Sequence, residues 1–182
     1  MRVVSQASDS VFPEFVENAR WSLGGFVFAT IHVVGSGNGL GDFEGRTSEH
    51  DREVARRTAA AIDWLNGAFA AADSVDARGV VIALHGNMGL EGEPGTQRGH
   101  ERFVSRLREQ VTAFPGQVLL IHGDSHDQHV DQPLRDDEGR IFANFTRLET
   151  FGSPDIGWVR VVVDSVAGRV TQFEPRRFRG WW

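Results

Sequence analysis

Three stretches of the sequence are almost continuously apolar and have the length of a buried strand. They are residues 26–34, residues 80–84 and residues 118–121. Apolar and β-branched residues without regular polar alternation are typical of strands that are covered on both faces. We therefore predict three strands in the interior of a sheet.

Two stretches between these strands have helical periodicity. Apolar side chains recur at three- and four-residue steps in residues 48–73, and a shorter stripe does so in residues 97–113. The stripes consist of Val54, Thr58, Ile62, Leu65, Phe69 and Ala72, and of Phe103, Val104, Leu107 and Val111. Strands that alternate with helices predict right-handed crossovers and a parallel sheet. The carboxyl ends of such strands share one edge, where ligand sites form.

The flanking segments complete the expected fold. Residues 11–23 predict a short helix, with Ser10 as a cap and Pro13 in the first turn. Residues 141–151, 158–163 and 170–173 predict antiparallel strands. The expected class is α/β, with the order β-α-β-α-β followed by antiparallel strands, in a single domain over residues 1–182.

Composition narrows the class of protein. The net charge is −6, so we do not expect a broad basic surface that binds nucleic acid. The chain has no cysteine, which excludes disulfides and thiolate metal sites, and all 19 basic residues are arginine, which excludes a P-loop lysine. No window reaches the roughly 18 uncharged apolar residues of a membrane span, and the N-terminal residues lack a signal-peptide core. We therefore expect a cytoplasmic protein without a membrane partner.

Polar residues of the types that bind metal ions follow all three predicted strands. Asn38 lies in the glycine-rich loop 35–41, His85 follows the second strand, and Asp124 and His126 follow the third. Each residue alone has an ordinary explanation as a turn residue, a cap or a hydrogen-bonded strand end. Together they form a mixed nitrogen and oxygen set that suits manganese, iron, zinc or nickel. Their shared position predicts one ligand site.

The remaining histidines receive different interpretations. His122 and His129 flank the last loop and are candidates for supporting the ligands or for contacting substrate. His32 lies inside a predicted strand and is assigned to the core. His50 and His100 lie near helix starts and are expected to be solvated.

These motifs resemble those of the calcineurin-like metallophosphoesterases. Gly35-Ser-Gly-Asn38, His85 and Gly123-Asp-Ser-His126 resemble, in order, the family's Gly-Asn-His motif, its isolated metal-binding histidine and its Gly-His-x-His motif. The similarity covers roughly residues 12–165. It implies a partial metallophosphoesterase-like α/β sandwich, in which this chain corresponds to the C-terminal half of the family's domain.

The resemblance also implies roles for individual residues. Asn38, His85 and Asp124 would hold one metal ion, and His126 would belong to the other ion. Gly39 stands where the family has its catalytic histidine. The family's opening Asp-x-His and Gly-Asp-x-x-Asp motifs are missing from the N-terminal part of the sequence. The chain therefore looks like a truncated copy that holds one ion or none.

Three functions remain open at this point. The resemblance implies a metal-dependent phosphoesterase for a small phosphoester, weak or inactive as this chain because a bridging ligand and an acid are missing. An alternative is a non-catalytic remnant of the fold that acts by binding or assembly. A second alternative is a serine esterase using Ser125, because Gly123-Asp-Ser125 resembles the nucleophile block of GDSL hydrolases. An incomplete fold would leave strand edges open, so we also expect a homo-oligomer.

Overall fold

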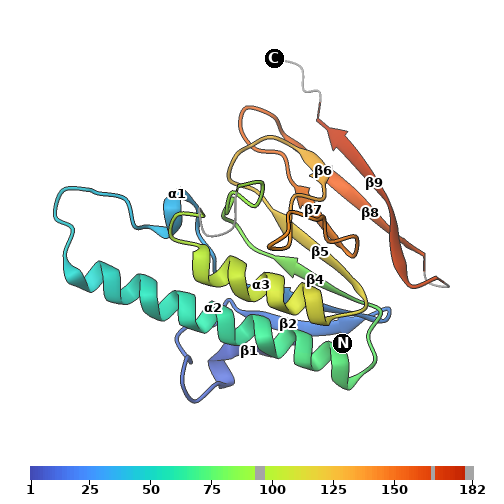
Figure 1. Ribbon diagram of the computed structural model, residues 1–182, viewed down its shortest axis with the longest axis horizontal. Coiled ribbons are helices and arrows are strands. Elements are labelled where there is room, and N and C mark those ends of the chain that lie inside the picture. The colour runs from blue at the N-terminus through green and yellow to red at the C-terminus, as the bar shows by residue number, and fades with distance from the viewer. Residues whose placement is uncertain (93–96, 165–166, 179–182) are drawn as a thin grey trace.

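The computed structural model describes residues 1–92, 97–164 and 167–178 (Figure 1). Its elements, in chain order, are β1 (Val4–Ser5), the 3-10 turn η1 (Gln6–Ser8), β2 (Ala19–Leu23), β3 (Phe26–Thr30), α1 (Gly35–Asn38), α2 (Ser48–Ser74), β4 (Gly79–Ala83), α3 (Glu101–Ala113), β5 (Gln117–His122), β6 (His129–Asp131), β7 (Phe145–Glu149), β8 (Gly157–Asp164) and β9 (Arg169–Arg177).

Strands β3, β4 and β5 form the parallel centre of the larger sheet, as the sequence predicts. In the described part of the chain this sheet has seven strands in the order β1-β2-β3-β4-β5-β7-β6. Residues 26–30 pair in register with residues 79–83, which pair in turn with residues 117–121. The predicted α/β class is confirmed, although a mixed sheet with few helices does not by itself identify a metallophosphoesterase.

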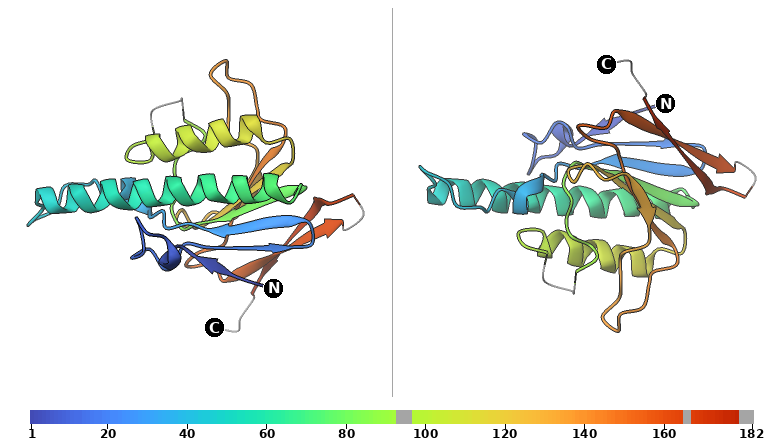
Figure 2. Two further views of the ribbon diagram at one scale, coloured as in Figure 1. Left: turned by 90° about the horizontal axis from the view of Figure 1, so that it is seen from below. Right: turned by 90° about the horizontal axis from the view of Figure 1, so that it is seen from above.

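Helices α2 and α3 lie side by side against one face of this sheet (Figure 2). Alternate residues of β3, β4 and β5 point into this layer, where they bury an apolar core with the predicted helical stripes.

Helix α2 begins at a capping box. The Thr47 side chain accepts from the N–H of Glu49, and the His50 ring accepts from the N–H of Thr47. His50 is exposed, as predicted.

The opposite face of the sheet is covered only in part. The β8–β9 hairpin packs Val159, Val161 and Phe173 against residues such as Leu119 and Leu148. Toward the carboxyl ends of β3, β4 and β5, the same sheet borders an open pocket of about 560 Å³. This pocket adjoins the edge at which the sequence predicts a ligand site.

The predicted helix over residues 11–23 is wrong, because most of its second half forms strand β2. Gly24 and Gly25 have φ values of 60° and 82° and make a two-residue turn that folds β2 back onto β3. Trp21 stacks on its cross-strand partner Phe28 at 5.4 Å between ring centroids. Strand pairing therefore overrides the cap and proline signals in this segment.

The C-terminal strands also differ from the prediction. The strand expected over residues 141–151 is β7, and it pairs parallel to β5 rather than joining a purely antiparallel tail. Its other neighbour is the short strand β6, which pairs antiparallel to it and which the sequence pattern did not reveal. The antiparallel pairing of β8 with β9 is as expected.

The described sheet ends in two short strands, β1 with 2 residues and β6 with 3. Short edge strands expose little unpaired backbone, so the open-edge argument for a homo-oligomer is weaker than the sequence suggested. The homo-oligomer stays a prediction. In the described residues, no helix has the length and apolar content needed to cross a membrane.

We predict that Gly24→Ala destabilises the fold and that Gly41→Ala does not. A Cβ at either position meets no atom within 4 Å, but only Gly24 has a left-handed backbone, with φ of +60°. The left-handed region costs an L-residue about 1–2 kcal/mol. Urea unfolding of both variants measures the difference, and equal free energies of unfolding would contradict the assigned turn.

Candidate functional site

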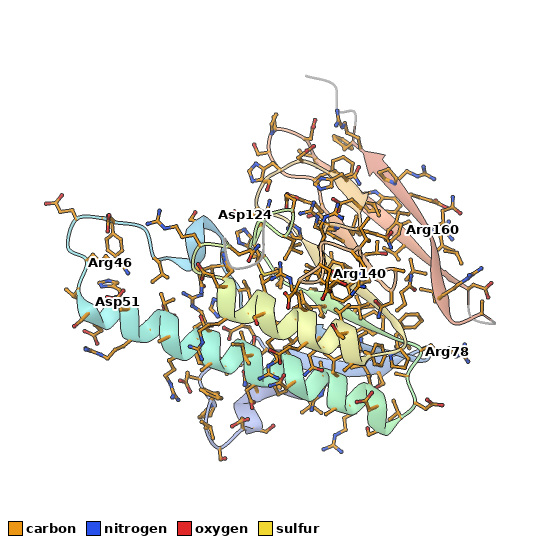
Figure 3. All side chains as sticks on the ribbon, viewed as in Figure 1. Arg46, Asp51, Arg78, Asp124, Arg140 and Arg160 are labelled. Carbon is orange, nitrogen blue, oxygen red and sulfur yellow. The ribbon has the colours of Figure 1, made fainter. Side chains whose placement is uncertain are left out.

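The loops that follow β3, β4 and β5 meet at the carboxylate of Asp124. Its Oδ2 accepts a hydrogen bond from the backbone N–H of Asn87 at 3.0 Å, in the loop after β4. It also lies so close to Gly35, in the loop after β3, that a Cβ there would sit 2.0 Å from Oδ2. Asp124 lies beside α1, at the end of the sheet opposite to Arg78 (Figure 3). We call this meeting point of residues 35–38, 85–87 and 123–126 the rim.

Further contacts tie the three loops of the rim together. The N–H of Gly123 donates to the carbonyl of His85 at 3.2 Å, and the N–H of Gly86 donates to the carbonyl of Val33 at 3.0 Å. The ring of His100 is buried and donates from Nε2 to the carbonyl of Val34 at 2.9 Å. The predicted exposure of His100 is therefore wrong, because this ring anchors the start of α3 to the rim.

The rim concentrates unusual backbone geometry. Among the described non-glycine residues, positive φ occurs at Ser36, Asn38, Asp124 and His126, all in the rim, and at Asp76 outside it. Such conformations are costly and persist only where the surroundings hold them. Their concentration here is typical of a binding site.

Asn38 is held by structural contacts on the helix side of the rim. Its side chain is buried, with Nδ2 donating to Thr58 Oγ1 at 3.0 Å and to the carbonyl of Gly99 at 2.7 Å. Its Oδ1, the atom that would bind a metal ion, accepts from the guanidinium of Arg57. Arg57 is fixed in turn by Glu53 at 2.8 Å.

His85 is exposed and lines the open pocket at the carboxyl ends of the strands. His32 lines the same pocket and forms an ion pair with Glu17. The assignment of His32 to the core is therefore wrong, because the part of this sheet face near Thr30 and Thr150 is not covered by the β8–β9 hairpin.

His126 contacts a different segment from Asn38. Its Nδ1 donates to the carbonyl of Ser153 at 2.8 Å, and its ring fills the space beside Gly152 that a Cβ would occupy. The structure thus brings Asp124 together with the backbone of the His85 loop. It holds the amide of Asn38 against the helices and the ring of His126 against residues 152–153.

The four predicted ligands do not fit a ready-made metal centre. The oxygen of Asn38 already pairs with a cation, and His126 packs against another segment. Across residues 1–92, 97–164 and 167–178, no group of three or more His, Asp or Glu side chains is arranged to hold a metal ion. The nitrogen and oxygen atoms of these residues are of the types that bind a divalent ion, but the four side chains do not point toward a common position.

A buried polar cluster that the motif comparison missed lies next to the rim. His122 on β5, Glu149 on β7 and His129 on β6 are direct cross-strand partners, so their side chains share one face. Glu149 is fully buried, and its Oε1 accepts from the N–H of Ser125 at 3.1 Å. Burial lowers the pKa of His122, which keeps this ring neutral near pH 7.

Two residues earlier on the same strands, the buried guanidinium of Arg147 forms ion pairs with two partly exposed carboxylates. Arg147 binds the carboxylate of Asp131 through two bonds of 2.8 and 2.7 Å and contacts Glu91 at 3.0 Å. Phe145, Arg147 and Glu149 are alternate residues of β7 and therefore share one face of the sheet. The first is in the apolar core, and the next two are charged. This alternation was the signal in the sequence that could have revealed the cluster.

Ser125 gives no support to the serine-esterase alternative. Its Oγ accepts from Nδ2 of Asn87, and no histidine of the described chain hydrogen-bonds to it. A serine nucleophile needs a base within hydrogen-bond reach.

No family model, curated protein or solved structure matches this chain. The interpretation of the rim therefore depends on its own geometry and on the motifs in the sequence.

We predict that Gly35→Ala destabilises the chain by about 1–3 kcal/mol, because the new methyl group would overlap the Asp124 carboxylate. In an Asp124→Ala background the same substitution should cost much less, because the obstructing oxygens are gone. Denaturant unfolding of both single variants and the double variant measures this coupling. Strictly additive effects would show that the two loops do not touch.

Proposed function

We propose that this chain is a metallophosphoesterase-like protein that binds a small phosphoester at the rim and hydrolyses it weakly at best. The divalent ion of the proposal is manganese, iron, zinc or nickel, with no more than one ion per chain. The main support is the meeting of three strand-end loops at Asp124, where the N–H of Asn87 and the carboxylate lie together.

Two further features support a ligand at this place. The carboxyl ends of parallel strands are the usual position of ligand sites in α/β proteins, and left-handed non-glycine residues gather in the rim. The adjoining pocket of about 560 Å³ has the size of a small-molecule site and is lined by His32 and His85.

The chain's own residues suggest how a phosphoester would be held. His85 is exposed at the pocket, where its ring can donate a hydrogen bond to a phosphoryl oxygen or to the leaving group. Asp124 organises the loops that surround this position. Gly39 replaces the histidine that the resembling family uses as an acid, which accounts for the low turnover that we expect.

The test is hydrolysis of p-nitrophenyl phosphate and bis-p-nitrophenyl phosphate with added manganese. We expect slow turnover that falls at least about tenfold in His85→Ala and in Asp124→Ala, because a donor and the loop anchor are lost. His50→Gln is the matched control, since this exposed histidine lies at the start of α2. Equal rates in the wild type and in all three variants would reject the proposed enzyme.

A non-catalytic binding protein is the second candidate, and one observation favours it. The guanidinium of Arg57 occupies the oxygen with which Asn38 would bind a metal ion. A binding protein of this kind would bind phenylphosphonate, whose carbon–phosphorus bond resists hydrolysis. It would hydrolyse neither of the two p-nitrophenyl esters. Isothermal titration with phenylphosphonate separates this outcome from a chain that binds no phosphoryl group at all.

A further inference from the structure

Two buried acceptor atoms beside the rim have no partner. Nε2 of His122 and Oε2 of Glu149 are both inaccessible to solvent and make no hydrogen bond, and they lie 3.9 Å apart. Leaving a buried polar atom unsatisfied costs about 1–3 kcal/mol, so such atoms call for an explanation. Because the two atoms lie so close together, a single bound group could satisfy both of them.

The hydrogen bonds of both histidines specify what kind of group this is. Nδ1 of His122 lies 2.9 Å from the carbonyl of Gly123, and Nδ1 of His129 lies 2.8 Å from the carbonyl of Asp127. A carbonyl only accepts, so each Nδ1 carries a proton, which leaves Nε2 as the ring nitrogen that can offer a lone pair to a metal ion. Backbone carbonyls orient metal-binding histidines in this same way.

Three potential ligand atoms therefore come together where β5, β7 and β6 pair, with Oε2 of Glu149 near both ring nitrogens. Nε2 of His129 lies 4.0 Å from Oε2 of Glu149, which is 3.9 Å from Nε2 of His122. Adjacent ligands of a tetrahedral zinc ion stand about 3.3–3.4 Å apart, given bonds of about 2.0–2.1 Å. The ring nitrogens of His122 and His129 each lie at least about half an ångström farther from Oε2 of Glu149 than two ligands of one zinc ion would. The three side chains would have to move closer together to bind an ion.

The charge of the surroundings favours a cation. Asp131 and Glu91 both bind the guanidinium of Arg147, and Glu149 lies near the two histidines, so three carboxyl groups stand near a single arginine. A divalent cation would satisfy both unpaired acceptors beside these carboxyl groups, whereas an anion would be disfavoured there. The side chain of His129 is 34% exposed and gives the cluster its contact with solvent.

We propose that His122, Glu149 and His129 close on one divalent transition-metal ion, of the zinc or manganese class, through Nε2, Oε2 and Nε2. This His122–Glu149–His129 site differs from the four-residue set predicted from the motifs, and Glu149 belongs to no motif. The bond from Ser125 to Glu149 connects the site to the rim. The inference deepens the proposed function and rests on it for the role of the ion, but ion binding can be measured without any phosphoester.

The test is isothermal titration of the full chain, freed of metal by a chelator, with zinc chloride and with manganese chloride. We expect one ion per chain and a thermal midpoint that rises with the metal. Glu149→Gln and His129→Gln should each weaken binding at least about tenfold, because the first replaces a carboxylate with a neutral amide and the second removes the imidazole nitrogen. His50→Gln, an exposed histidine at the start of α2, is the control and should bind as the wild type does, and Asp124→Asn distinguishes an ion at the rim from an ion at the His122–Glu149–His129 site.

The outcomes are distinct. If Glu149→Gln fails to fold, as judged by its circular dichroism spectrum, the partly exposed His129→Gln variant still gives the answer. Absence of binding by the wild type, or wild-type affinity in His129→Gln, would overturn the site. Loss of binding in Asp124→Asn alone would place the ion at the rim. Zinc binding with the expected variant pattern but no ester hydrolysis would uphold the site and count against the proposed enzyme.

Discussion

The parallel pairing of β3, β4 and β5 is the constraint on which the rest of the structure depends. Because these strands run in the same direction and in register, their carboxyl ends reach one edge of the sheet. The loops that leave this edge therefore begin side by side, and the carboxylate of Asp124 lies between two of them. The chemistry of the edge follows from this geometry, since polar groups from three distant parts of the sequence meet there.

The addition of β7 and β6 beyond β5 extends the same edge with a different kind of surface. Strand pairing places polar side chains in two rungs on one face of the sheet, one with the ion pairs of the buried Arg147 and the other with His122, Glu149 and His129. The first rung is satisfied internally by two carboxylates. The second is not, since two of its atoms have no partner. This contrast is the reason why we propose an ion at the second rung and not at the first.

Much of the architecture could be predicted from the sequence, because apolar runs and helical stripes report burial directly. The three central strands and the apolar faces of α2 and α3 were found in this way. Strand β2 was missed because its stability comes from pairing with β3 across Gly24 and Gly25, which outweighs local helix signals. Asn38 was predicted from its motif, but its amide points to Arg57, a partner 19 residues away that no local pattern reveals. Glu149 was missed because its role depends on two cross-strand neighbours.

The central claim is that this protein binds its ligand ion at the carboxyl edge of the parallel strands. Paramagnetic broadening of backbone amide signals by substoichiometric manganese, in a nitrogen-15-labelled chain, tests it most directly. Our account predicts selective loss of the signals of residues at that edge, such as Asn87, Ser125 and Glu149, while Gly25, Gly79 and Gly116 at the opposite edge keep theirs. Broadening at the opposite edge, or none at any amide, would contradict it.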